Sequence, residues 1–146
     1  MRLRDHEDGL GLTELCEVHV TDDPHPVNGA HHEYELWRTL LPGDRSPQGY
    51  HGAIPAITRG GKTGDQAFVG FVRFQRGPRA EPDSTPGTLD GALLSVLIHR
   101  LRCFQQGPFA STENNEVLTY LEAALEALKR RARERAARGV LGRNVR

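Results

Sequence analysis

The sequence lacks the features of several large protein classes. Its two cysteines, Cys16 and Cys103, form neither a disulfide framework nor a metal-ligand spacing. Both lie in segments with apolar periodicity, so we expect buried, reduced thiols. No apolar run approaches the roughly 20 residues of a membrane-spanning helix, and the N-terminus lacks the apolar core of a signal peptide. These absences predict a soluble, intracellular protein whose residues 1–146 form a single domain.

Net charge is also lacking, because 19 basic residues balance 19 acidic ones. The distribution is uneven, since residues 1–35 hold nine acids against two arginines, and residues 129–146 hold one lysine and seven arginines against Glu134. A basic end of this kind attracts phosphate, RNA or an acidic patch on a second copy of the chain. A solvated helix end explains the same charges equally well.

The first half of the sequence has the patterns of a small antiparallel sheet. Residues 15–20 and 32–37 alternate between polar and apolar, and residues 67–74 are aromatic and β-branched, so each is expected to form a strand. Residues 1–12 are expected to be a frayed arm. Residues 38–65 are rich in glycine, proline and serine and are expected to form an exposed loop or insertion, with a hairpin tip at its end, residues 60–64, as the alternative. With these loops, the sheet part extends over residues 13–78.

The second half has the periodicity of two helices. Thr88 is the expected N-cap of the first helix, and Gly107 with Pro108 is expected to end it. Ser111 or Thr112 is expected to cap the second, and Gly139 to follow its last turn. A short connection forces an antiparallel hairpin over residues 88–139. The predicted fold class is therefore α+β, with an N-terminal antiparallel sheet followed by a C-terminal antiparallel two-helix hairpin.

Two groups of side chains suit a nucleotide ligand. Arg131 and Arg135 lie one turn apart beside the apolar stripe of the second helix, where guanidinium groups need counter-charge and match a pyrophosphate. Phe104 and Asn114 lie near the interhelical turn and offer a stacking face and an amide for a purine. The two groups are about five helical turns apart, so two antiparallel copies would be needed to combine them. Helix-dipole compensation by the arginines and a turn sealed by aromatics are the alternatives.

Two other interpretations remain open at this stage. A cluster of histidines, His19, His25, His31 and His32, suggests a metal-dependent nuclease or phosphodiesterase, although no familiar ligand spacing is present. The basic C-terminal helix suggests a small nucleic-acid-binding protein. No nucleophile–base pair or acid–base carboxylate pair can be identified. This favours binding over catalysis, with no catalytic residue, metal or cofactor expected.

Several longer stretches resemble one phage family. They are Phe74-Gln-Arg-Gly-Pro, Ile98-His-Arg-Leu-Arg-Cys-Phe-Gln, Gly107-Pro-Phe-Ala-Ser-Thr-Glu-Asn, Leu118-Thr-Tyr-Leu-Glu-Ala-Ala-Leu and Arg131-Ala-Arg-Glu-Arg-Ala-Ala-Arg-Gly-Val-Leu-Gly. Over residues 28–37 and 66–142 the chain resembles the Thoeris anti-defence sponge proteins. These are related through their helical hairpin to the phage sponges that act against cyclic-oligonucleotide signalling.

The resemblance implies a specific function in the cytoplasm of an infected bacterium. Such proteins bind a cyclic ADP-ribose immune signal without cleaving it, and some also take cyclic oligonucleotides. They form dimers and often hexamers, with no nucleic-acid or membrane partner expected. Carried over by position, the ligand-binding residues are Phe104, Asn114, Arg131 and Arg135.

The sequence also departs from that family's pattern. Ser111-Thr112 replaces a usual Cys-Arg pair, Ala127 replaces a common tryptophan, and Leu141 replaces a usual glutamate. The loss of one cation near the pocket leaves the preferred signal open.

Overall fold

The computed structural model describes residues 1–10, 15–26, 29–41, 58–61 and 64–143. The chain divides into two compact units, Met1–Arg73 and Phe74–Arg146, and each is described by itself. The single domain expected over residues 1–146 stays a prediction.

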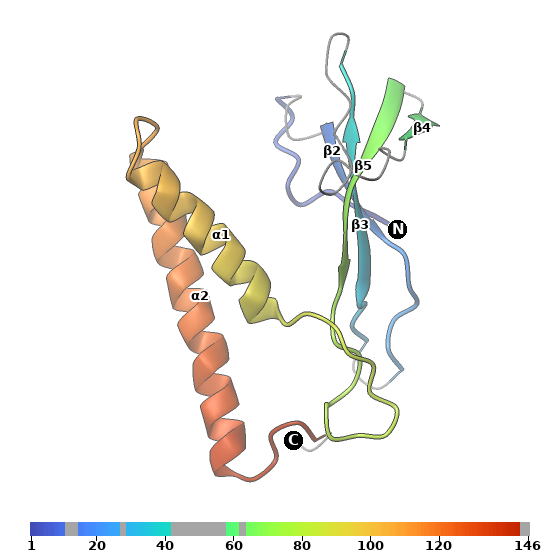
Figure 1. The fold of residues 1–146 in the computed structure, drawn as a ribbon, viewed down its shortest axis with the longest axis vertical. Coiled ribbons are helices and arrows are strands. Elements are labelled where there is room, and N and C mark those ends of the chain that lie inside the picture. The colour runs from blue at the N-terminus through green and yellow to red at the C-terminus, as the bar shows by residue number, and fades with distance from the viewer. Residues whose placement is uncertain (11–14, 27–28, 42–57, 62–63, 144–146) are drawn as a thin grey trace, which may run out of the picture. The chain divides into compact units, whose positions relative to one another are not determined.

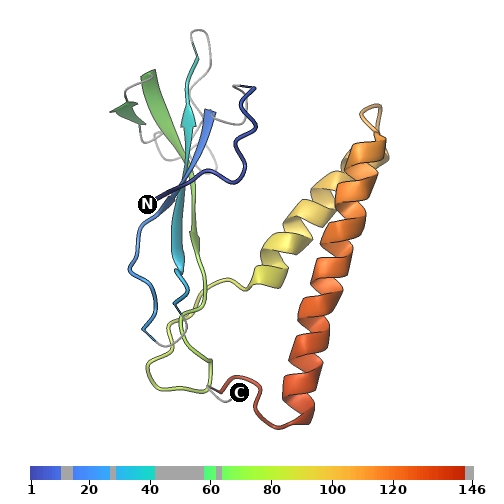
Figure 2. The same ribbon diagram turned by 180° about the vertical axis from the view of Figure 1, so that it is seen from behind.

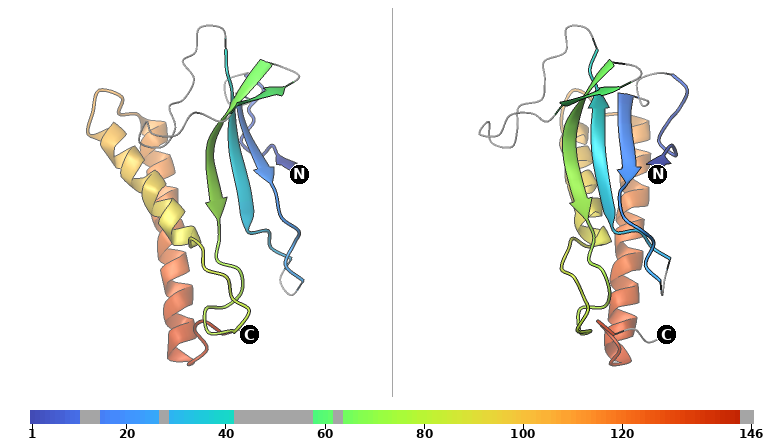
Figure 3. Two further views of the ribbon diagram at one scale, coloured as in Figure 1. Left: turned by 45° about the vertical axis from the view of Figure 1, so that its right-hand side comes forward. Right: turned by 90° about the vertical axis from the view of Figure 1, so that its right-hand side faces the viewer.

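The first unit is an antiparallel sheet of five strands in the order β1-β2-β3-β5-β4. Figures 1 and 3 show β2, β3 and β5 side by side at its centre. The strands are β1 (Arg2–Leu3), β2 (Cys16–Val20), β3 (Glu33–Thr39), β4 (Thr58–Gly61) and β5 (Gly64–Arg73). The three strands expected from the sequence are all present, and their ends differ from the expected ones by a few residues.

Two strands were not expected. Residues 1–12 are not simply a frayed arm, because Arg2 and Leu3 pair with His19 and Val18 of β2. The loop expected over residues 38–65 is likewise wrong for residues 58–61, which pair with β5 as in the hairpin that was the alternative. Residues 42–57 lie outside the described part of the chain. β1 is specified by a partner further along the chain and β4 by pairing with the adjacent β5, and local propensity reports neither.

The sheet has a small core where β3 and β5 meet. The Trp37 ring packs edge to face against Phe68 with centroids 5.4 Å apart, and Ala67 is fully buried. The Trp37 indole nitrogen donates a hydrogen bond to the Glu35 carboxylate at 2.9 Å, so its polar edge is satisfied. A register shift between Leu36 and Trp37 interrupts the β3–β5 ladder at this point.

The second unit contains the helical hairpin. Helix α1 spans Asp90–Gln105 and α2 spans Thr112–Ala137, and Figure 2 shows the two running in opposite directions from a short turn. Ser111 caps α2, because its hydroxyl accepts a hydrogen bond from the Asn114 backbone amide at 3.0 Å. Gly139 follows α2 with φ of 68°, as expected for a residue after a C-cap. The predicted α+β fold class is confirmed.

Thr88 is not the cap of α1. The N-cap is Leu89, which makes no side-chain cap bond. Thr88 instead forms a parallel bridge with Phe74, and its carbonyl accepts a hydrogen bond from the Gln75 amide at 3.0 Å. The stretch that leads into the hairpin is therefore held by backbone pairing.

Much of the apolar surface of the hairpin stays exposed in the single chain. Ile98 is the buried residue of α1, and α2, described over its full length, has none. Large apolar side chains that are at least 46% exposed lie along both helices: Leu89, Val96, Leu97, Val117 and Tyr120. A surface of this kind is typical of a protein that associates with a partner.

Candidate ligand-binding site

The interhelical turn is organised by a glutamine that the sequence analysis did not single out. The Gln105 side chain donates to the Ser111 carbonyl at 3.0 Å and accepts from the Ser111 amide at 2.9 Å. It therefore closes the turn from the last residue of α1 to the N-cap of α2. Such a role is hard to recognise from the sequence. A glutamine in the last turn of one helix can bond the N-cap of the next helix, but glutamine is also an ordinary helix former.

Phe104 and Asn114 both belong to this end of the hairpin. Phe104 is partly exposed, and the Arg100 guanidinium lies 4.8 Å from its ring centroid, a cation–π distance. The Asn114 side-chain amide donates to the Phe109 carbonyl at 3.3 Å, and the Phe109 ring is itself 73% exposed. The turn thus presents aromatic surface and a positioned amide, which suits stacking and hydrogen bonding to a base.

The two candidate arginines lie toward the other end of α2. Arg131 follows Asn114 by 17 positions, which at 1.5 Å per helical residue corresponds to about 26 Å. Within one chain the structure therefore does not bring the arginines to Phe104 and Asn114.

The environments of the two arginines differ. Arg131 is exposed, and its side chain makes no ion pair or hydrogen bond within the described residues. Arg135 is half-buried and donates to the carbonyls of Val140 at 3.1 Å and Arg143 at 2.7 Å. The expectation that both need an external counter-charge is thus wrong for Arg135, because backbone carbonyl oxygens of the segment after α2 accept its hydrogen bonds.

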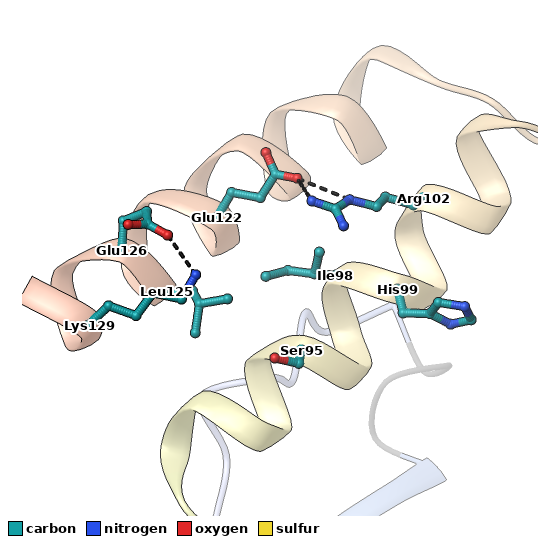
Figure 4. A pocket seen from close by; sticks show the side chains of 8 residues that line it. All are labelled: Ser95, Ile98, His99, Arg102, Glu122, Leu125, Glu126 and Lys129. Carbon is teal, nitrogen blue, oxygen red and sulfur yellow. Dashed lines mark hydrogen bonds and ion pairs between the residues drawn. The ribbon is translucent and has the colours of Figure 1, made fainter. Parts of the chain in front are cut away.

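A groove of about 400 Å³ lies between the middles of the two helices. Figure 4 shows the Arg102 guanidinium reaching Glu122 across it, with a nitrogen–oxygen distance of 2.6 Å. On α2 the Lys129 ammonium lies 2.7 Å from Glu126, which lowers the pKa of the Glu126 carboxyl by hydrogen bonding and by its positive charge. Ile98 and Leu125 supply the apolar part of the lining. The groove has paired charges of both signs and no evident ligand preference.

The histidine cluster does not form a metal centre in the part of the chain that the structure describes. No group of three or more His, Cys, Asp or Glu side chains there is arranged to hold a metal. His31 and His32 lie 3.4 and 3.7 Å from the Asp22 carboxylate. His25 packs edge-on against His32 at a centroid distance of 5.7 Å. This geometry gives the metal-dependent nuclease alternative no support.

Two carboxylates of the sheet unit have structural roles. Asp22 accepts hydrogen bonds from the backbone amides of His32 at 2.8 Å and Glu33 at 3.1 Å. Burial raises its pKa, but these bonds outweigh burial and leave the pKa below its usual value. Burial likewise raises the pKa of Glu17, and the His19 hydrogen bond with the Arg2 charge brings it below its usual value. Both carboxylates are thus stabilised in their charged form.

The two thiols are not buried as expected. Cys16 and Cys103 are both free and exposed. Cys16 lies at the start of β2, 3.6 Å from an Arg38 nitrogen, and Cys103 lies on α1 with its sulfur 3.9 Å from His99. Apolar periodicity was misleading here, because Cys16 is at the exposed start of a strand whose other end, Val20, is buried, and Cys103 shares an exposed face of α1 with His99.

Comparison with known proteins bears on the family resemblance. No family model matches the chain. Over 71 residues it is 41% identical to Thoeris anti-defense 1 of Bacillus phage SBSphiJ7, and the match covers 49% of each chain. The resemblance to the Thoeris anti-defence family is confirmed. The chain spans about half the length of this curated relative.

One departure from the Thoeris anti-defence pattern has a structural explanation. At Ser111, where the resemblance led us to expect a cysteine, the hydroxyl caps α2 by accepting a hydrogen bond from the Asn114 backbone amide. Serine is among the preferred N-cap residues. The Ser111 side chain therefore holds the backbone at Asn114 in place.

None of the helices in the described ranges combines the length and the apolar character that crossing a lipid bilayer demands.

Proposed function

We propose that this protein binds and sequesters, without cleaving it, a cyclic ADP-ribose-type immune signal. It would act as a phage anti-defence protein in the cytoplasm of the infected host. The observation that carries the proposal is the 41% identity over 71 residues to Thoeris anti-defense 1. The chemistry of the hairpin ends supports it, because each end suits one part of such a ligand.

The turn end suits the base. Phe104 offers an aromatic face whose electrons already attract the Arg100 guanidinium at 4.8 Å, and a purine stacks on such a face. Asn114 offers both a donor and an acceptor. Its backbone is held by the Ser111 cap and its side chain by the Phe109 carbonyl, so little ordering is needed upon binding.

The arginine end suits the pyrophosphate. Arg131 and Arg135 are one helical turn apart, so their guanidinium groups extend from the same face of α2. A guanidinium bonds two phosphate oxygens at once, and such charge-assisted bonds are among the stronger ones in proteins. Arg131 is exposed and suited to direct contact. Arg135 is anchored by the Val140 and Arg143 carbonyls, which fixes its orientation.

A complete site requires a second copy of the chain. The two ends are separated by about 26 Å of helix, which exceeds the reach of side chains around one small ligand. An antiparallel pair of hairpins places the turn of one chain beside the arginines of its partner. The exposed apolar side chains of α1 and α2, among them Val96 and Tyr120, are suitable for the contact between copies.

The proposal is tested by recovering the ligand. The protein is mixed with a cyclic ADP-ribose isomer, separated from unbound ligand and heat-denatured, and the released molecule is analysed by mass spectrometry. Sequestration predicts release of intact ligand in a fixed ratio to protein. A cleaved product, or no retained ligand with any isomer, contradicts the proposal.

Matched variants test the arginine end. Arg131→Ala removes charge-assisted bonds worth about 2 kcal/mol, which corresponds to roughly a 30-fold loss of affinity. Arg130→Ala is the matched control, because it makes the same charge change at the neighbouring, exposed position. Only screened long-range attraction is lost in this variant, so its ligand affinity should stay within about threefold of that of the unaltered protein. Equal losses in both variants would show that general basic charge is sufficient, as in binding to long polyanions.

A further inference from the structure

We propose that His99 and Cys103 form a bidentate site for a borderline-soft divalent cation of the Zn²⁺ class on α1. The proposal is independent of the function proposed above, because it uses neither the turn residues nor the arginines of α2.

The donor atoms have the separation that a chelate needs. The Cys103 sulfur lies 3.9 Å from His99 Nε2. A tetrahedral zinc ion bonded to a thiolate at about 2.3 Å and to an imidazole nitrogen at about 2.0 Å holds these atoms roughly 3.5 Å apart. Both side chains are exposed, so a small rotation closes the difference. Residues four apart on a helix share a face, the spacing that places two ligands of helical zinc sites on one ion.

The chemistry of the pair selects the cation class. A thiolate with an imidazole favours Zn²⁺ and similar transition ions over Mg²⁺ or Ca²⁺, which prefer oxygen ligands. On binding, the Cys103 thiol releases its proton to solvent and the sulfur donates an electron pair to the metal, while neutral His99 donates through Nε2. Figure 4 shows the His99 ring directed away from Glu122 and Glu126, so water fills the remaining coordination positions.

The electrostatic surroundings tolerate a bound cation. Cys103 is in the last turn of α1, which ends at Gln105, and the carbonyls of a helix C-terminus favour positive charge. The nearest basic residues in sequence are engaged elsewhere, since Arg102 pairs with Glu122 at 2.6 Å and Arg100 lies over the Phe104 ring.

The second cysteine provides an internal control. Cys16 is also free and exposed, but its sulfur lies 3.6 Å from an Arg38 guanidinium nitrogen. The nearby His6 ring is hydrogen-bonded to the Cys16 carbonyl at 2.8 Å. A fixed positive charge beside the sulfur disfavours a metal ion, so Cys16 is not expected to bind one.

Titration of the full-length protein with Co²⁺ tests the site, because a thiolate–cobalt bond has a charge-transfer absorption that water and imidazole ligands lack. We expect this band to appear with a single Co²⁺ per chain and to disappear when Zn²⁺ displaces the cobalt. Cys16→Ser retains the band and Cys103→Ser loses it. His99→Gln weakens Co²⁺ binding roughly 100-fold, because the chelate partner is gone.

Several results would overturn the proposal. If the band persists in Cys103→Ser, or is lost in Cys16→Ser, the thiolate ligand is not Cys103 and the proposal is wrong. No band in the unaltered protein excludes the site, and an unchanged Co²⁺ affinity in His99→Gln excludes the chelate. Circular dichroism of each variant verifies that the protein remains folded, which is expected because all three substituted side chains are exposed.

Discussion

Replacing Gln105 by alanine should selectively destabilise the turn that carries Asn114. Alanine removes both bonds between the Gln105 side chain and the Ser111 backbone, at 3.0 and 2.9 Å. Each such bond contributes about 1 kcal/mol net. The higher helix propensity of alanine returns a few tenths of a kcal/mol. The expected loss is therefore about 1.5 to 2 kcal/mol.

Gln106→Ala is the matched control. Gln106 is the neighbouring glutamine, it is exposed, and its side chain makes no hydrogen bond within the described residues. Its replacement should change stability by less than about 0.5 kcal/mol, as surface substitutions usually do. The two variants thus compare one chemical change at two positions that differ in hydrogen bonding.

Two measurements report the effect. Urea unfolding followed by circular dichroism at the helical band gives the stability of the hairpin. Hydrogen exchange of the Ser111 amide gives the local effect, because this amide is the donor that loses its acceptor. A loss of about 2 kcal/mol corresponds to exchange roughly 30-fold faster. Equal stability losses in the two variants, or unchanged Ser111 exchange in Gln105→Ala, would refute the assignment of Gln105 as the residue that closes the turn.

Two further predictions concern backbone packing and charge. Gly87→Ala places a Cβ within 2.5 Å of the backbone that follows β5, so thermal unfolding should show a loss of about 2 to 3 kcal/mol in stability. In Gly91→Ala the new Cβ meets one flexible side-chain atom at 3.4 Å. This variant should stabilise α1 by up to about 1 kcal/mol, because alanine has the higher helix propensity. The pKa values of Asp22 and Glu17 are lowered in the folded state. These two carboxylates therefore stabilise the folded protein fully at pH values above their unfolded pKa values, near 4, and this stabilisation is lost as the pH falls through their folded pKa values. Tryptophan fluorescence should therefore report a stability that falls from pH 5 toward pH 2, with a shallower slope in Asp22→Asn. A slope that Asp22→Asn leaves unchanged contradicts that assignment.

The helical hairpin could be predicted from the sequence because its signals are local. Apolar side chains recur at helical spacing, and Ser111 and Gly139 mark one start and one end by their own backbone chemistry. Thr88 was misassigned because a threonine before an acidic first turn has the sequence pattern of a cap. Its backbone instead pairs with Phe74, a contact fourteen residues away in sequence that no local pattern reports.

The sheet was predictable at its centre and not at its edges. β3 and β5 have the alternating or aromatic composition of strands, whereas β4 has the sequence Thr-Arg-Gly-Gly, and glycine is unfavourable in strands. β4 exists because it pairs with β5 as far as Gly61 and Gly64, so β5 supplies the template. The two-residue strand at Arg2–Leu3 depends in the same way on β2.

The candidate site was partly predictable for a similar reason. The chemistry of Phe104, Asn114 and Arg131 can be recognised from residue type and spacing. The bonds of Arg135 to the Val140 and Arg143 carbonyls depend on how the chain turns after Gly139, where φ is 68°. Sequence patterns report which side chains share a helix face, but not which carbonyls a turn brings back to that face.

A site divided between the two ends of α2 has a thermodynamic consequence under the proposed function. If the base contacts Phe104 of one chain and the pyrophosphate contacts Arg131 of another, each ligand bound also holds two chains together. Ligand affinity and chain association then increase one another by the same factor, because linkage is reciprocal. The exposed apolar residues of the hairpin, such as Val96 at 64% and Tyr120 at 65%, would supply enough association to preform the cleft. The arginines would then discriminate among ligands, since a molecule lacking the pyrophosphate forgoes the charge-assisted hydrogen bonds that the guanidinium groups offer.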